Sequence, residues 1–195
     1  MKSTFILPTE YAPTAVIDLV HNKRQFWLVN GISLALLVVA LLPAAFSVPI
    51  AHLFEGVREG ALLPFALRML ALGAGAFVYI LLHELVHGIV IRIVSGKWGY
   101  FGFKSIYAYA GSHAYFAKAP YLIIALAPVV LWGILLGIAA AFVPRTWFWV
   151  VYIIELINVS GAAGDLYVTA RMVKLPKDIF VKDDGTAMTV YARKN

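Results

Sequence analysis

Two histidines and a glutamate form the word His83-Glu84-Leu85-Val86-His87 within a stretch that is otherwise apolar. In a helix, four residues of separation put both imidazoles on one face, where they can bind a single zinc ion. Glu84 then stands where a general base for an attacking water molecule is needed. Because a charged side chain in a bilayer costs about 2.5–3.5 kcal/mol on insertion scales, an acid at this place predicts a function.

A catalytic zinc site usually has three protein ligands, and this chain has no cysteine to supply one. The last apolar stretch offers Asp165 and Glu155. His87 lies five residues before Arg92, and Asp165 lies six before Arg171. If these arginines mark the cytoplasmic edge of the membrane, both residues lie about 8–9 Å from that edge. Glu155 would lie about 15 Å farther along its helix. We therefore expect Asp165 to be the third ligand, with a structural ion pair or hydrogen-bonded acid as the alternative.

Two further polar residues could contact a substrate. Asn158 lies seven residues before Asp165, on nearly the same helical face, and could hydrogen-bond an oxyanion or an extended peptide. A hydrogen bond between helices explains Asn158 equally well. His113 lies between two apolar stretches and could bind substrate, although a polar tip at the membrane interface is the simpler interpretation.

The composition predicts an integral membrane protein. Of 195 residues, 62% are hydrophobic and 13% are charged, whereas soluble domains are about 45–50% apolar and about 25% charged. Four segments are long enough to cross a bilayer core, which takes about 20 helical residues. They run from about Phe26 to Phe54, Phe65 to Val94, Pro120 to Val143 and Thr146 to Val173.

Two segments outside these spans have the composition of strands. The connection Ser95 to Ala119 is rich in aromatic residues and glycine, which predicts short strands or a hairpin at the interface. In Ile179 to Tyr191, the word Asp183-Asp184-Gly185 predicts a turn between two extended pieces. We expect an all-α membrane fold of about four helices, with interfacial strands between the second and third. It forms one domain over 1–195, with its core at about 65–173 and a small cytoplasmic extension at about 174–195.

The net charge of +6 is best explained by membrane topology. The basic residues flank the apolar segments, and all but three of the 16 fall on one side of the predicted spans. Short cytoplasmic loops are enriched in Lys and Arg, so both termini are expected in the cytoplasm of a cell-membrane protein. No basic stripe or binding motif predicts nucleic acid as a partner.

The motif in an early span, Gly164-Asp165 in a later span and the aromatic connection between them resemble the site-2 protease type of intramembrane zinc metalloprotease. The resemblance is strongest to a group of short bacterial zincin peptidases. It implies that His83, His87 and Asp165 bind zinc while Glu84 is the base. The chain differs from the better-known members, because Asp165 stands in Gly-Asp-Leu instead of Leu-Asp-Gly and no regulatory domain is inserted.

These observations predict a zinc endopeptidase embedded in the lipid bilayer. Its expected partner is a membrane protein or peptide bound in an extended conformation. Cytoplasmic-side peptides or prenylated tails are an alternative substrate class. A different class of function is a non-hydrolytic membrane protein with a structural or transported metal at the same cluster. Glu84 distinguishes the two classes, because a static metal site does not need a general base.

Overall fold

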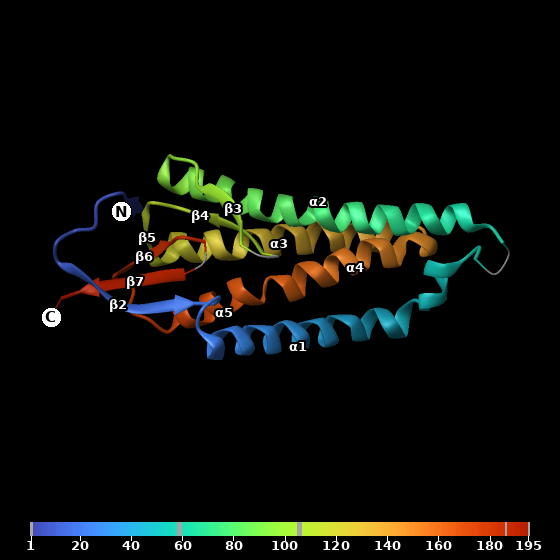
Figure 1. Ribbon diagram of the computed structural model, residues 1–195, viewed down its shortest axis with the longest axis horizontal. Coiled ribbons are helices and arrows are strands. Elements are labelled where there is room, and N and C mark those ends of the chain that lie inside the picture. Colours follow the sequence, from blue (N-terminus) through green and yellow to red (C-terminus); the bar gives the residue numbers. More distant parts are fainter. Residues whose placement is uncertain (1, 58–59, 105–106, 186, 195) are drawn as a thin grey trace. The chain divides into compact units, whose positions relative to one another are not determined.

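The computed structural model describes residues 2–57, 60–104, 107–185 and 187–194 (Figure 1). Within these residues, four helical segments are long and apolar enough to cross a membrane, as the sequence predicted. These segments are α1 (Lys23–Ser47), α2 (Leu62–Ser95), α3 (Lys118–Phe142) and the pair α4 (Arg145–Gly161) and α5 (Ala163–Val173). In the most apolar 18-residue stretch of each segment, the share of residues buried inside the protein is 6% for the first segment and 33% for the last. Their remaining apolar surface supports the assignment as a membrane protein.

Two of the spans differ from the prediction. The first is shorter, because α1 ends at Ser47 and the 3₁₀ helix η1 (Ile50–Phe54) follows Pro49. The residue before a proline is driven out of the helical region, which explains the end. The last span is broken by a turn at Ala162, between α4 and α5. Glycines on both sides of this turn weaken the helix locally.

Seven strands occur among the described residues, and all the observed pairs are antiparallel. A hairpin of β3 (Tyr100–Lys104) and β4 (Tyr107–Gly111) confirms the prediction for the connection between the second and third spans. The other strands form one sheet in the order β1-β5-β6-β7-β2. They are β1 (Ser3–Thr4), β2 (Tyr11–Asp18), β5 (Tyr115–Ala117), β6 (Ile179–Asp183) and β7 (Ala187–Arg193).

The all-α description of the fold is therefore too narrow. The β6–β7 hairpin was predicted, but the N-terminal strands β1 and β2 were not. Strand β2 contains Pro13 at an irregularity in its pairing with β7, so it lacks the regular alternation that identifies a strand in sequence. The sheet also depends on pairing between segments far apart in the chain, which local sequence patterns do not predict.

The chain divides into two compact units. The strand-containing unit comprises Met1–Asn30, Leu82–Pro128 and Gly164–Asn195. The helical unit comprises Gly31–Leu81 and Val129–Ala163. Within the strand-containing unit, the strands gather around the C-terminal end of α2, the N-terminal end of α3 and α5 (Figure 1). The expectation of a single domain stays a prediction.

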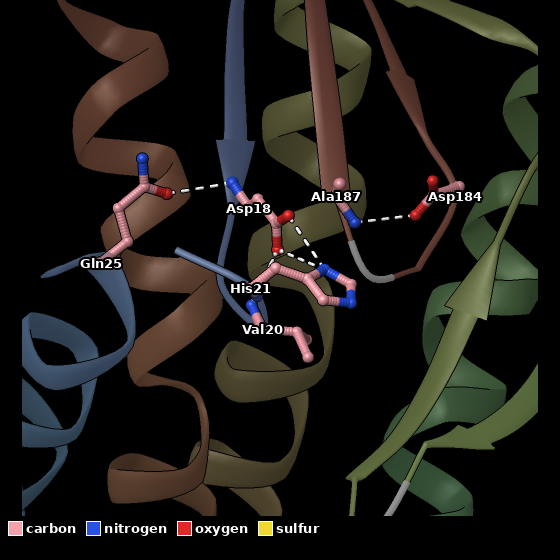
Figure 2. Close-up of polar contacts among 6 residues, drawn as sticks. All are labelled: Asp18, Val20, His21, Gln25, Asp184 and Ala187. Carbon is pink, nitrogen blue, oxygen red and sulfur yellow. Dashed lines mark hydrogen bonds and ion pairs between the residues drawn. The ribbon is translucent and has the colours of Figure 1, made fainter. Parts of the chain in front are cut away.

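Two aspartates close the turns at one end of the β2–β7 ladder (Figure 2). The Asp18 carboxylate accepts backbone N–H bonds from Val20 and His21, while the Asp18 N–H donates to the side chain of Gln25. Asp184 accepts the N–H of Ala187, the residue that pairs with Asp18. Burial opposes ionisation of Asp18, but the two backbone N–H groups together with the His21 side chain outweigh it and hold its pKa below the usual range. These contacts fix where β2 ends and α1 begins.

The β3–β4 hairpin is attached to the turn of the β6–β7 hairpin. The Tyr100 hydroxyl donates to the Asp184 carbonyl at 3.2 Å, and the Ser112 N–H donates to the Asp183 carbonyl at 2.9 Å. Gly185 has a φ of +83°, and a Cβ added there would come within 2.1 Å of the Tyr109 ring. Glycine therefore permits both the turn and the close approach of the aromatic ring.

The helical unit has a core of its own. Buried residues of α1, η1 and α4 pack together there, namely Ala44, Leu53, Trp149 and Val150. The Arg68 side chain is 4% exposed, and its guanidinium donates to the carbonyls of Leu53 and Glu55 at the end of η1. This buried cation is thus bonded to backbone carbonyls, a usual solution for a charged side chain in a membrane helix.

Candidate metal centre

His83, His87 and Asp165 lie together in the strand-containing unit. Both histidines are on α2, one turn apart, and Asp165 is in the first turn of α5. The Nε2 atoms of His83 and His87 lie 3.5 and 3.6 Å from Oδ2 of Asp165. One donor atom from each residue can be chosen so that all three lie within 4.8 Å of one another. Three potential ligands thus converge from two helices.

This donor set fits zinc. Two ligands of a tetrahedral zinc ion, each at about 2.0–2.1 Å, lie about 3.3 Å from each other. The two distances from imidazole nitrogen to carboxylate oxygen are close to that value. Two imidazoles and a carboxylate are also a usual ligand set of catalytic zinc sites, which keep a fourth position for water or substrate.

The orientation of His87 is fixed by a backbone group. Its Nδ1 lies 2.9 Å from the carbonyl oxygen of Ile124 on α3, and the contact is buried. Because a carbonyl only accepts hydrogen bonds, Nδ1 must carry a proton. In the neutral imidazole, Nε2 is then left with the lone pair that a metal ion requires. The sequence alone did not identify this carbonyl as a partner.

Glu84 follows His83 on α2 and contacts the β3–β4 hairpin. Its carboxylate accepts a hydrogen bond from the Ala110 N–H of β4 and lies within electrostatic reach of all three potential ligands. Strand β3 also lies against this helix, because a Cβ added at Gly88 would come within 2.3 Å of the Phe101 ring. The absence of a side chain at Gly88 allows the hairpin to approach Glu84.

A further acid, Asp183, lies within electrostatic reach of His87 and Asp165. The sequence did not identify it as a neighbour of the centre. The Tyr121 hydroxyl donates to its Oδ2 at 2.6 Å, and the Gly185 N–H donates to its Oδ1 at 2.8 Å. Burial raises the pKa of Asp183 to about 6, although these two donors oppose the shift. The hydrogen bond between Tyr121 and Asp183 connects β6 to the first turns of α3. The same helix carries Ile124, whose carbonyl contacts His87. The only sequence signal for Asp183 was the predicted turn.

Asn158 and Glu155 belong to the helical unit. Asn158 is fully buried, and its side chain is bonded to the Tyr79 hydroxyl at 2.9 Å, the Val129 carbonyl at 3.3 Å and the Glu155 carboxylate at 3.2 Å. These bonds connect α2, α3 and α4, which is the helix-to-helix role that the sequence also allowed. A role for Asn158 in substrate binding stays a prediction.

His113 lies in the strand-containing unit, between β4 and β5. Its side chain is exposed, and its ring lies against that of Tyr100, with the two centroids 5.0 Å apart. This contact accounts for an aromatic residue with a polar tip at this position. Its role in substrate binding also stays a prediction.

The model of one protein family, described as "Putative zincin peptidase", matches residues 76–180. The match covers more than half of the chain, so this chain belongs to that family, in agreement with the resemblance seen in its motifs. No curated protein and no solved structure matches it. All four residues of the predicted centre fall within the matched segment. The family points to a zinc metallopeptidase, and the cluster of two histidines and an aspartate can hold the metal.

Proposed function

We propose that this protein is a membrane-embedded zinc endopeptidase of the site-2 protease type, with His83, His87 and Asp165 as zinc ligands and Glu84 as the general base. The observation that carries the proposal is the convergence of the three ligand atoms beside a glutamate on the same helix. A non-hydrolytic metal site accounts for the ligands but gives no role to Glu84.

When bound by these residues, zinc would act as a Lewis acid that polarises the peptide carbonyl and lets water ionise near neutral pH. Glu84 accepts the proton of the attacking water and then gives it to the leaving amine. The Ala110 N–H holds the Glu84 carboxylate in place, and the Ile124 carbonyl holds the imidazole of His87. The chain thus orients a base and a ligand before substrate arrives.

The substrates of this proposal are membrane-associated proteins or peptides that bind in an extended conformation. A helix uses its own carbonyls in hydrogen bonds, so a scissile segment has to unwind before attack. Because the Ala110 N–H points to Glu84, the edge of β4 lies beside the base. An extended segment added along this edge would bring its carbonyls next to Glu84. Segments with weak helical propensity are therefore the expected targets.

We infer that the protein resides in the cell membrane with both termini in the cytoplasm. The basic residues flanking the four spans support this orientation. The strands carry polar turns such as Asp183-Asp184-Gly185 and lie at the end of α2 that carries Arg92. This orientation would make the metal centre accessible from the cytoplasmic side.

The proposal is tested with purified protein in liposomes that contain a fluorogenic single-span peptide. One peptide carries Asn-Pro-Gly in its span, and the matched peptide carries Leu at those positions. We expect cleavage of the first peptide, inhibition by a zinc chelator and recovery when zinc is added. Zinc uptake into the vesicles without cleavage of either peptide would favour transport and contradict the proposal.

Gly88→Ala should lower the rate of cleavage by up to about 100-fold while zinc stays bound. The added methyl group would displace the Phe101 ring and move the β3–β4 hairpin away from Glu84, and displacements of about 1 Å can cost this much rate. The matched control is Gly73→Ala on the same helix, where nothing lies within 4 Å of the added Cβ. Equal rates for the two variants would show that the hairpin does not position the base.

A further inference from the structure

The Ile124 carbonyl that bonds His87 belongs to the interior of a helix. In an α-helix, each such carbonyl normally accepts the N–H of the residue four positions later. Four positions after Ile124 is Pro128, which lies inside α3 and has no N–H to donate. The carbonyl is therefore without its helical donor and is free to accept the Nδ1 proton of His87 at 2.9 Å.

The surroundings of this contact make the hydrogen bond important. His87 is 9% exposed, Ile124 is 5% exposed, and Pro128 is fully buried. An unpaired carbonyl in the core of a membrane protein is costly, so His87 stabilises α3 while α3 orients His87. A proline ring also pushes against the carbonyl four residues before it, which tilts that carbonyl away from the helix axis.

We propose that Pro128 is a positioning residue of the metal centre. By withholding an N–H from α3, it leaves the Ile124 carbonyl available to His87, which keeps the proton on Nδ1 and Nε2 available for the metal. The inference rests on the metal-binding part of the proposed function and is independent of which substrate is cleaved. The inferred role of Pro128 is to free a carbonyl for His87, which differs from the bending of a helix by a proline.

Pro128→Ala tests this inference, because the new N–H competes with His87 for the same carbonyl. We expect the zinc dissociation constant, measured by competition with a chromophoric chelator, to rise about 10- to 100-fold, as for the loss of other partners of metal-bound histidines. The thermal stability of the metal-free protein should change little, since the Ile124 carbonyl exchanges the His87 donor for an N–H of its own helix. The ligand-field spectrum of the Co²⁺-substituted variant should shift, because the imidazole is no longer held.

The matched control is Pro43→Ala, which restores an N–H inside α1, in the helical unit. It should leave both zinc affinity and the Co²⁺ spectrum unchanged. If Pro128→Ala binds zinc as tightly as the wild type and shows the same Co²⁺ spectrum, the inference is wrong, while the proposed function stands. If the wild type binds no zinc, the proposed function itself fails.

A measurement on the wild type covers the case in which Pro128→Ala does not fold. The nitrogen NMR spectrum of metal-free protein with ¹⁵N-labelled histidine reports which nitrogen of neutral His87 carries the proton. We expect a proton on Nδ1 and a bare Nε2. A neutral imidazole with its proton on Nε2 and a bare Nδ1 would show that the Ile124 carbonyl does not control the ring and would overturn the inference.

Discussion

Glu84→Gln should abolish nearly all peptide hydrolysis while zinc stays bound. Glutamine keeps the size of the side chain but cannot accept a proton, and general-base catalysis usually contributes about 10²- to 10⁴-fold to a rate. We therefore expect cleavage of the fluorogenic peptide to fall by about that factor. Zinc content and thermal stability should remain those of the wild type.

The matched control for this variant is Glu155→Gln, which removes a second glutamate of the candidate membrane spans. Glu155 accepts a hydrogen bond from Asn158 in the helical unit and is not a member of the ligand cluster. Its replacement should leave cleavage close to the wild-type rate. Undiminished hydrolysis by Glu84→Gln would show that Glu84 is not the general base.

Asp165→Ala should weaken zinc binding by at least about 100-fold, because even the loss of an outer partner of a ligand costs about 10- to 100-fold. The variant removes a carboxylate whose oxygen lies 3.5 and 3.6 Å from the Nε2 atoms of the two histidines. Cleavage should be lost with the metal. Competition with a chromophoric chelator measures the dissociation constant directly.

Glu155→Gln is again the informative comparison, since Glu155 was the other candidate for the third ligand. It should bind zinc as the wild type does. The assignment fails if Asp165→Ala keeps its full zinc affinity. Loss of zinc in Glu155→Gln would then transfer the third position to Glu155.

The spacing of residues within single helices was enough to predict much of the candidate centre. The two histidines lie four residues apart, so one α-helix brings them to the same face. Asp165 was assigned from its depth relative to flanking basic residues, because both spans must fit a bilayer of fixed thickness. Its donor atom does lie near those of His83 and His87. Zinc binding by these residues stays a prediction until it is measured.

The partners that orient the centre could not be predicted, because they are backbone groups of other segments. A proline inside a helix leaves the carbonyl four residues earlier without its helical donor, but nothing in the sequence connects the carbonyl of Ile124 to His87. The Ala110 N–H likewise reaches Glu84 only through the folding of β4 against α2. Residue types do not tell which distant segment will supply the partner of a backbone group, so tertiary packing alone reveals it.

In the sheet, too, features set by neighbouring residues could be predicted, whereas pairing between distant segments could not. The turn at Asp183-Asp184-Gly185 predicted the β6–β7 hairpin, because glycine and aspartate supply the required turn chemistry. Strand β2 was not predicted, since it pairs with β7 from the opposite end of the chain and contains Pro13. Its pairing is established by long-range contacts and not by a local pattern.

The most direct test is the zinc content of three purified proteins by elemental analysis: the wild type, Glu84→Gln and the double variant His83→Ala with His87→Ala. We expect about one zinc per chain in the first two and none in the third. The absence of zinc from all three, even after controlled addition of the metal, would contradict the metallopeptidase assignment of this centre.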